Sequence, residues 1–301
     1  MWKKKGLLIE PNPQVPWMSH YAGPTFVEVG ASGKLVLYVT GRDALNRSRI
    51  GRVHAVIKEQ EIVVERVDES PVFDIGGIGQ FDESGVSYPW ICDVGDRKFM
   101  YYVGWVAGGL ARFQNFTGLA ISEDGGETYH RYKKVPILDR TEDEPFGSGS
   151  CAVYPRDGKF EMLYTAFEPW GLRHGKLQPS YNIKYAYSDD GLDWHREGDA
   201  AINFKDETEY VIGKPMPLLE GGVHKLWYSY RGEAYRIGYA ESLNGHNYLR
   251  KDEEAGIEVS ESGWDSEMIE YAFVFRSGTD LFMIYNGNQF GKTGLGWAIQ
   301  E

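Results

Sequence analysis

The 301 residues carry 44 acidic and 32 basic side chains, and the net charge of −12 argues against a nucleic-acid partner and against an anionic membrane surface, because both would repel the chain. The 20 Tyr, 14 Phe and 9 Trp, together with 37 Gly, favour strands joined by turns over long helices. This length and composition predict one large all-β domain.

The first residues, MWKKKGLLIEPNP, have a basic start, but only Leu7, Leu8 and Ile9 follow before Glu10. That apolar run is too short for a signal peptide, and no stretch of the chain approaches 18 apolar residues. Two cysteines, Cys92 and Cys151, lie in apolar, strand-like segments without the spacing of metal ligands, which is typical of reduced thiols. We therefore expect a cytoplasmic protein with no cofactor and no metal.

A strand pattern recurs five times and ends each time at an aromatic residue and a turn: KLVLYVTG, KFMYYVGW, FEMLYTAF, HKLWYSYRG and LFMIYNG. Its tyrosines are 57 to 64 residues apart, and they are Tyr38, Tyr102, Tyr164, Tyr228 and Tyr285. Another strand, which passes through an alanine, follows each copy. Three of these strands run into SEDGGETY, SDDGLDW and SLNGHNY, where an Asp-Gly or Asn-Gly pair supplies the positive φ angles of a tight hairpin.

Each repeat also holds an apolar run before the tyrosine strand, so four strands recur with a period of about 55 to 65 residues. This arithmetic predicts an all-β, five-bladed β-propeller with four-stranded blades, in a single domain over residues 1–301. We expect the blades at about residues 18–70, 80–139, 144–204, 207–259 and 264–301. The last blade is one strand short, and residues 6–10, GLLIE, are expected to pair in it and close the ring, which removes exposed sheet edges.

The C-terminal stretch NGNQFGKTGLGWAIQE resembles a phosphate-binding P-loop, but only three residues separate Gly287 from Gly291 where the motif needs four. Strand-like residues then follow where the motif needs a helix. We interpret the stretch as the fifth copy of a hairpin turn, so no nucleotide is expected. Asn288 and Lys292 are still expected to point into the central channel.

In a propeller, the starts of the inner strands and the turns between the second and third strands converge at one face of the channel. Four inner strands are preceded or opened by carboxylates, and the first has His20 instead; the acids are Asp82, Glu83, Glu144, Glu207, Glu209, Glu267 and Glu270. The turns hold a basic excess: Arg42, Arg47, Arg49, Arg112, Arg173, Lys176, Arg231, Arg236 and Lys292, against Asp43, Glu168 and Glu233. This excess predicts a cleft for an anionic group, such as a phosphate or a sugar carboxylate. The alternative is that individual arginines pair with carboxylates or extend into solvent.

Aromatic and amide side chains are expected near the same face, where rings could stack on sugars and amides could bind hydroxyl groups. They are Trp90, Trp105, Trp170, Tyr230, Tyr271, Gln114, Asn115 and Asn288. Each aromatic residue taken singly is more typical of a core than of a ligand platform. Together with carboxylates, which perform the acid and base steps of glycosidic cleavage, the set indicates a carbohydrate site.

The segments GRDALNRS, DESGVSYPW, YSYRGEAYRIGYAES, GWDSEMIEY and YNGNQFGKTGLGWAI resemble the five-bladed glycosidase superfamily of glycoside hydrolase families 32, 43, 62, 68, 117 and 130. The resemblance covers essentially the whole chain. Within the superfamily, the sequence is most similar to a bacterial branch labelled glycosidase-related. It implies a propeller with catalytic carboxylates around the channel. Hydrolases of this group commonly use an aspartate in the first blade, where WMSHYAGP has Ser19 and His20. Phosphorylases of family 130 combine one acid with basic residues that bind phosphate. The motif GRDALNRS and the basic loops of this chain resemble that arrangement.

We therefore expect a glycoside hydrolase-like enzyme that acts on a sugar with an anionic group, with Asp82 and Glu267 as the catalytic acid and base. The expected substrate-binding residues are His20, Arg42, Asp43, Arg47, Trp90, Trp105, Gln114, Asn115, Glu144, Glu209, Lys214, Arg231, Glu270, Tyr271, Asn288 and Lys292. Two alternatives remain, a glycoside phosphorylase that uses inorganic phosphate and a non-catalytic glycan-binding propeller. The expected partners are a small-molecule or oligosaccharide substrate and phosphate, with no nucleic acid and no membrane.

Overall fold

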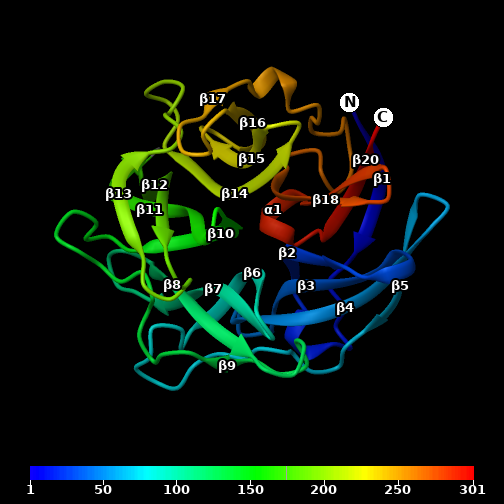
Figure 1. The fold of residues 1–301 in the computed structure, drawn as a ribbon, viewed down its shortest axis with the longest axis horizontal. Helices are drawn as coiled ribbons and strands as arrows, with labels where there is room; N and C mark the ends of the chain where they lie inside the picture. Colours follow the sequence, from blue (N-terminus) through cyan, green and yellow to red (C-terminus); the bar gives the residue numbers. More distant parts are fainter. Residues whose placement is uncertain (174) are drawn as a thin grey trace.

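The computed structural model describes residues 1–173 and 175–301. Within them the chain forms 20 β-strands, three 3-10 helices and one short α-helix. The strands pair in antiparallel groups of four, and we call each group a blade. Figure 1 shows the blades around the middle of the molecule, with β2, β6, β10, β14 and β18 nearest to it.

The strands have the following bounds. The first blade contains β2 (Tyr21–Val29), β3 (Lys34–Arg42), β4 (Ser48–Lys58) and β5 (Glu61–Val67). The second contains β6 (Gly85–Val94), β7 (Arg97–Ala107), β8 (Phe113–Ser122) and β9 (His130–Arg131). The third contains β10 (Ser148–Arg156), β11 (Lys159–Arg173), β12 (Lys176–Ser188) and β13 (His195–Ala200). The fourth contains β14 (Val211–Glu220), β15 (Val223–Arg231), β16 (Tyr235–Ser242) and β17 (Leu249–Arg250). The fifth contains β18 (Glu270–Ser277), β19 (Asp280–Asn286), β20 (Leu295–Gln300) and β1 (Trp2–Ile9). The helices are η1 (Pro16–Met18), η2 (Ala31–Gly33), η3 (Asp252–Glu254) and α1 (Asn288–Gly291).

The N-terminal strand completes the fifth blade. β1 pairs antiparallel with β20, so that Trp2 lies opposite Gln300 and Ile9 opposite Leu295. The predicted pairing of the two termini is confirmed, although the strand begins at Trp2 rather than at residue 6. The additional residues are held by packing, because the ring of Trp2 makes an edge contact with Trp227 at 6.1 Å between centroids.

The five tyrosines that mark the repeats are buried in the second strands of their blades. In three blades the tyrosine hydroxyl donates to an acid that precedes the inner strand: Tyr102 to Asp82 (3.0 Å), Tyr164 to Glu144 (2.8 Å) and Tyr285 to Asp265 (3.0 Å). We call Asp82, Glu144, Glu209 and Asp265 the corner acids. Each is paired with a cation of the outermost strand of its blade, respectively Arg131, Arg196, Arg250 and Lys4. The corner acids therefore connect the inner and outermost strands of the second, third, fourth and fifth blades.

The first blade has a different corner. Trp17 packs where a side chain on Gly41 or Gly51 would collide with it, as Trp264 packs on Gly287 and Gly296 in the fifth blade. Trp264 is followed by the corner acid Asp265, whereas Trp17 is followed by the buried Met18. The corner of the first blade is therefore apolar, which explains why no acid was found there in the sequence.

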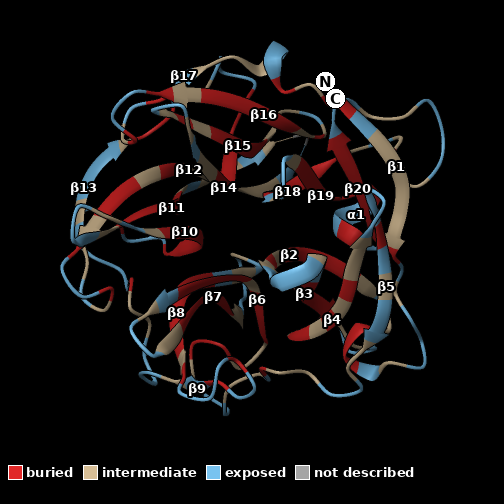
Figure 2. Cartoon of the chain, turned by 45° about the vertical axis from the view of Figure 1, so that its right-hand side comes forward, coloured by how far each residue is buried: buried red, intermediate tan, exposed pale blue. Residues whose placement is uncertain are grey.

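The glycine-rich C-terminal stretch connects β19 to β20, which pair antiparallel, and contains the four residues of α1. This is the hairpin connection that was expected. Figure 2 shows that buried residues follow the strands nearer the middle of the molecule, while exposed residues gather in the connecting loops and in the outer strands β5 and β13. In the parts of the chain that the structure describes, no helix has the length and hydropathy needed to cross a membrane.

Candidate functional site

The five inner strands share an irregularity that shapes the middle of the molecule. In each, two residues stand between the paired positions and form a β-bulge: 23–24, 88–89, 149–150, 214–215 and 271–272. Tyr88, Lys214 and Tyr271 adopt positive φ angles of 52°, 53° and 57° there. Such a conformation is uncommon for residues with a side chain and re-aims that side chain relative to a regular strand. All three residues line the central cavity.

Hydroxyl groups of the preceding blade hold these bulges. The backbone N–H of Tyr88 donates to Thr40 (3.0 Å), that of Lys214 to Thr165 (3.4 Å) and that of Tyr271 to Ser229 (2.7 Å). The three acceptors belong to the second strands β3, β11 and β15, one or two residues after the buried tyrosine of the repeat. The repeat motif therefore positions the cavity-lining residues of the next blade.

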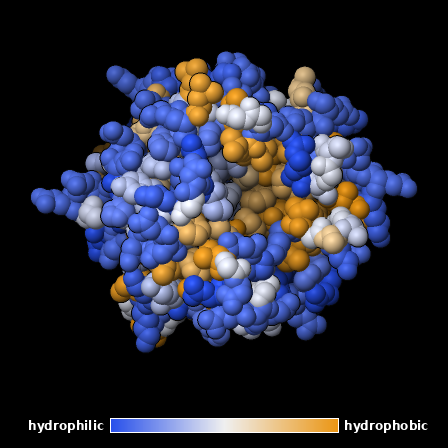
Figure 3. Space-filling view, in the orientation of Figure 1, coloured by the Kyte–Doolittle hydropathy of each residue, from blue (hydrophilic) through white to orange (hydrophobic). Residues whose placement is uncertain are grey.

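The cavity has a volume of about 490 Å³ and receives side chains from all five blades. Its cations are Arg42, Arg112, Lys214 and Arg231, and its aromatic residues include Trp105 and five tyrosines, Tyr21, Tyr88, Tyr181, Tyr235 and Tyr271. Among the residues that the structure describes, no Asp or Glu lines it. Figure 3 shows a hollow in the middle of the face viewed, beside the position of α1 in Figure 1, with apolar residues gathered around it.

The guanidinium groups of the cavity are held without direct carboxylate partners in the described part of the chain. Arg42 stacks on Tyr21, at 4.3 Å from the ring centroid, and donates to Asn46 at 3.3 Å. Arg231 lies against Tyr235 at 5.4 Å, and its buried Nε has no hydrogen-bond partner within residues 1–173 and 175–301. Aromatic faces orient a cation without neutralising it, so both groups keep their positive charge for a ligand.

One carboxyl group lies behind this lining. Glu270 is completely buried, and neither carboxyl oxygen has a hydrogen-bond partner among the described residues. Burial raises the pKa of Glu270 well above its ordinary value, while the charges of Arg231 and Arg42 act in the opposite direction. Burial is also the largest cause that raises the pKa values of Tyr88, Tyr181, Tyr235 and Tyr271. The tyrosines therefore remain protonated and can donate hydrogen bonds.

Substitution of Glu270 by Gln is expected to change how stability depends on pH. Because the folded-state pKa is raised, the folded protein retains a proton that the unfolded chain releases above about pH 4.5, so wild-type stability falls as the pH rises toward the folded-state pKa. The slope contributed by this group is at most about 1.4 kcal/mol per pH unit. Urea unfolding between about pH 5 and pH 8 should show that E270Q lacks this decline. The exposed Glu267 supplies the matched control, and an E267Q profile that shifted as much as that of E270Q would contradict the assignment.

The expected catalytic pair does not lie in the cavity. Asp82 is fully buried and is held by Arg131 at 2.7 Å and by the hydroxyl of Tyr102 at 3.0 Å. Glu267 is exposed, and its backbone N–H donates to Asn288. Neither carboxyl lines the cavity, which corrects their placement as acid and base in the channel. The physical reason is that Asp82 serves as a corner acid and that Glu267 precedes the bulge that turns residues inward.

Two further acids of the expected site are also corner acids. Glu144 contacts Arg196 at 2.9 Å and Lys184 at 3.2 Å. Glu209 is paired with Arg250 through both carboxyl oxygens. Both carboxylates form buried ion pairs inside their own blades. Their position therefore does not support the expected role in substrate binding.

The first-blade residues separate into one cavity residue and a group outside it. Arg42 lines the cavity, whereas Arg47 and Arg49 both pair with Asp43, at 3.0 and 2.7 Å. Burial raises the pKa of Asp43, but hydrogen bonds from Arg47 and Arg49 outweigh it and hold the pKa below its usual range. His20 is exposed and contacts Ser19. Of the motif GRDALNRS, therefore, the cavity receives Arg42 together with Asn46 and Ser48.

Four other expected residues lie outside the lining. Trp90 is buried between Phe26 and Phe273 and donates to the carbonyl of Val153. Gln114 and Lys292 are exposed. Asn288 accepts the N–H groups of Glu267 and Met268 and donates to Gly263, so it stabilises a loop and does not point into the cavity. The lookalike P-loop contributes Phe290 instead.

The structure brings together six of the expected residues in the cavity lining: Arg42, Trp105, Asn115, Lys214, Arg231 and Tyr271. Sequence reasoning did not select Tyr88, Tyr181 and Tyr235 for the site, and Arg112 was noted only in the basic excess of the loops. A signal for Tyr88 was present, because the prolines of AGP, YPW and GKP recur at the same place in three inner strands. Each of these prolines is the second residue of its bulge. The residue before it, Gly23, Tyr88 or Lys214, therefore occupies the equivalent first position.

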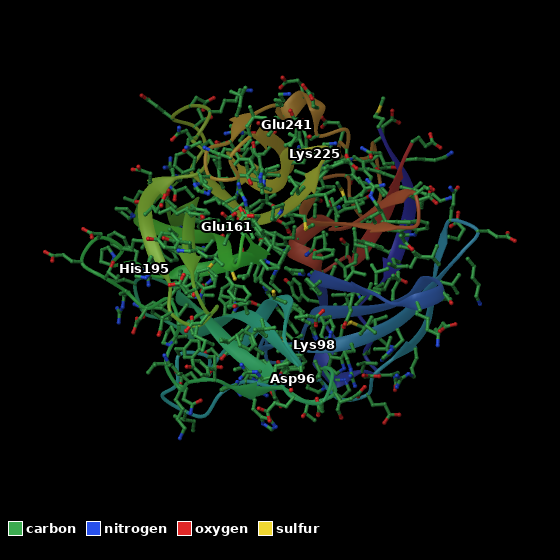
Figure 4. The ribbon with its side chains drawn as sticks, viewed as in Figure 1. Asp96, Lys98, Glu161, His195, Lys225 and Glu241 are labelled. Atoms are coloured by element: carbon green, nitrogen blue, oxygen red, sulfur yellow. The ribbon has the colours of Figure 1, made fainter. Side chains whose placement is uncertain are left out.

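Several charged side chains outside the cavity contact partners within or between blades. Lys98 contacts Glu28 of the first blade, Glu161 accepts from Tyr185 at 3.0 Å, and Lys225 contacts Glu220 at 2.6 Å. Figure 4 shows Lys98 in the second blade, Glu161 in the third and Lys225 in the fourth. No group of three or more potential metal ligands occurs in the described residues.

The fold is similar to that of several solved structures. A structure of BT0996 in a complex with RGII superposes with a TM-score of 0.75 at 17% identity, covering 99% of this protein and 91% of that one. A member of the family 130 mannoside phosphorylases, a family that contains hydrolases of β-1,2 mannosidic linkages in Candida mannan, gives 0.75 at 16%, covering 100% and 94%. A thermostable family 43 glycoside hydrolase gives 0.67 at 17%, covering 97% and 92%. The chain is an all-β protein with the fold of the five-bladed propeller glycosidases.

At the level of sequence, no protein-family model matches the chain. The uncharacterized proteins MT1551 and Rv1502 of Mycobacterium tuberculosis are each 31% identical to it over 300 residues, covering 100% of this chain and 99% of theirs. The chain belongs to the bacterial family of these two proteins.

Proposed function

We propose that this protein is a carbohydrate-active enzyme that holds an anionic group in its central cavity and transfers a glycosyl residue to or from inorganic phosphate. The observation that carries the proposal is the lining itself, in which Arg42, Arg112, Lys214 and Arg231 face the cavity and no described acidic residue does. Arginines bind phosphate through paired hydrogen bonds, and lysine binds it as a point charge. Tyrosines and Trp105 supply the rings and hydroxyl groups that sugars require.

The absence of a lining carboxylate pair among the described residues favours phosphorolysis over ordinary hydrolysis. Hydrolysis of a glycosidic bond uses two carboxyl groups, one of which activates water or attacks the sugar. In phosphorolysis, an oxygen of phosphate attacks the anomeric carbon while an acid protonates the departing glycosidic oxygen, which yields a sugar 1-phosphate and a free hydroxyl. Only one acid is needed, and we assign it to Glu270, which burial keeps protonated; because Glu270 does not line the cavity, its proton would pass to the ligand through a hydroxyl of the lining tyrosines. The family 130 neighbour belongs to a family described as mannoside phosphorylases that also contains hydrolases, so it supports glycosyl chemistry in general and the choice rests on the lining.

The proposal includes the form and location of the enzyme. We propose that the five blades form one closed domain, because β1 pairs with β20 to complete the fifth blade, and β18 of that blade lies in contact with β2 of the first. Cys92 and Cys151 are free and buried, which supports a cytoplasmic location.

A second candidate function is non-catalytic binding of a glycan. It is favoured by one observation, that Asp82 and Glu267 lie outside the cavity, so the chain lacks the expected catalytic arrangement. The complex of BT0996 with RGII supports ligand binding by proteins of this fold.

The test is a search for phosphate-dependent turnover. Purified protein would be incubated with mannose 1-phosphate and other sugar 1-phosphates, each with a panel of acceptor sugars, and released phosphate would be measured. We expect phosphate release only when donor and acceptor are both present, and K292M, which alters an exposed lysine outside the cavity lining, should behave as wild type. Cleavage of glycosides without phosphate would contradict the proposal. Binding of glycans without any turnover would support the second candidate.

A further inference from the structure

Lys214 is the most unusual cation of the cavity. Its side chain is 3% exposed, and its amine has no hydrogen-bond partner among residues 1–173 and 175–301. No carboxylate of the described chain lies within ion-pair distance of it, in contrast to the lysines Lys4, Lys98 and Lys184. A buried ammonium without a partner is costly, so this amine is suited either to a bound ligand or to the neutral state.

The surroundings of the amine are apolar. It lies over the rings of Trp90 and Phe273, at 5.7 Å from each centroid, and close to the buried thiol of Cys151. Burial lowers the pKa of Lys214 to about 8. A pKa of about 8 leaves on the order of one amine in ten neutral at pH 7, compared with fewer than one in a thousand for an ordinary lysine.

The backbone places Lys214 in the cavity lining with some strain. Lys214 holds a φ of 53° at the bulge of β14, where Pro215 follows and the N–H of Lys214 donates to Thr165. A left-handed conformation of a residue other than glycine persists where surrounding structure enforces it, and it is frequent at functional sites. The equivalent bulge position carries glycine in the first and third blades, so a lysine is not required there by the fold.

We propose that Lys214 is a nucleophilic amine that forms an imine with the carbonyl carbon of an anionic oxo acid, such as a 2-oxo acid or the open-chain form of a sugar acid. The neutral nitrogen attacks the carbonyl carbon, the C=N bond replaces the C=O bond, and the oxygen leaves as water with the two hydrogens of the amine. No oxidant or reductant is needed for this step. Arg42 and Arg231 in the same cavity supply cations for the carboxylate of the ligand.

This inference uses the cavity but does not depend on the glycosyl chemistry proposed above. If glycosyl transfer were absent, the amine would still react with oxo acids. Conversely, if Lys214 acted only as a charged contact for phosphate, glycosyl transfer would persist without any covalent adduct. The two proposals therefore fail in different experiments.

The experiment is reductive trapping. The full-length protein would be incubated with pyruvate or glyoxylate and sodium cyanoborohydride, and the modified lysines would be identified by mass spectrometry of peptides. We expect Lys214 to be modified at least tenfold faster than the exposed Lys292, with a rate that rises as the pH approaches 8. Acetone, which lacks the carboxylate, should modify Lys214 more slowly than pyruvate.

Two variants keep the result interpretable. K214R retains a positive charge but cannot form an imine, and K214M removes the charge as well. Both should show only slow modification of surface lysines, while thermal unfolding reports whether each variant is folded. If wild-type Lys214 is modified no faster than Lys292, or if K214R still gives a rapidly formed adduct at the cavity, the proposal is overturned.

Discussion

Replacement of Arg131 by Met is expected to lower the free energy of unfolding by about 3 to 5 kcal/mol, the typical result of removing one partner from a buried ion pair. Arg131 contacts Asp82 at 2.7 Å, and Asp82 is completely buried. Without the guanidinium group, the carboxylate would retain only the hydroxyl of Tyr102. The loss should be large because a charge that has lost its partner cannot be rehydrated without opening the second blade.

Urea unfolding of R131M, D82N and the double variant would measure this effect. D82N removes the buried charge together with its need for a partner, so D82N/R131M should be more stable than R131M alone. The surface pair of Arg66 and Asp68 provides the control, because Arg66 is 63% exposed and R66M should cost less than about 1 kcal/mol. An R131M protein of unchanged stability would show that Asp82 is not a structural corner acid.

Much of the fold could be predicted because propeller blades repeat. The buried tyrosine of the second strand recurs in all five blades at intervals of 57 to 64 residues, and the Asp-Gly or Asn-Gly hairpin recurs in three, so one sequence shows the same local pattern several times. The pairing of β1 with β20 followed from a simple count, because the last blade lacked a strand and the first residues had strand character. Such predictions depend on periodicity and do not require knowledge of where any single side chain points.

The site was harder to predict because the orientation of a side chain depends on partners that are distant in the sequence. Asp82 and Glu144 stand near the starts of inner strands, but their orientation is decided by Arg131 and Arg196, which belong to outermost strands about 50 residues later. Lys214 and Tyr271 face the cavity because of bulges, and a bulge is defined by the register with the neighbouring strand. Acidic residues at expected positions therefore became structural, while the residue beside Tyr271, Glu270, became the isolated carboxyl of the site.

The basic excess of the loops was a correct guide to the charge of the cavity but not to its individual members. Arg47 and Arg49 are paired with Asp43, so the positive potential rests on Arg42, Arg112, Lys214 and Arg231. Arg47 and Arg49 drop out of the set of available cations because the carboxylate of Asp43 lies within ion-pair distance of both and neutralises them before a ligand binds. The members of the cluster with no such neighbour are the ones available for binding.

Replacement of Arg231 by Met is expected to weaken the binding of inorganic phosphate or a sugar phosphate by about 10- to 150-fold, because hydrogen bonds to a charged group contribute about 1.5 to 3 kcal/mol. Arg231 lines the cavity, is oriented by Tyr235, and has a buried Nε without a partner in the described chain. R231K should fall between wild type and R231M, since it keeps the charge but loses the planar pair of donors.

Titration calorimetry or ligand-observed NMR would measure the affinity, with R236M as the matched control. Arg236 lies on β16 opposite Tyr230, but its guanidinium donates to the carbonyls of Tyr235 and Glu267 and does not line the cavity. The affinity of the wild type should also fall as the pH rises, because an ionised Glu270 would compete with the ligand for the charges of Arg231 and Arg42. In E270Q this pH dependence should be reduced. Equal loss of affinity in R231M and R236M would show that the anion binds on the rim of the molecule and not in the cavity.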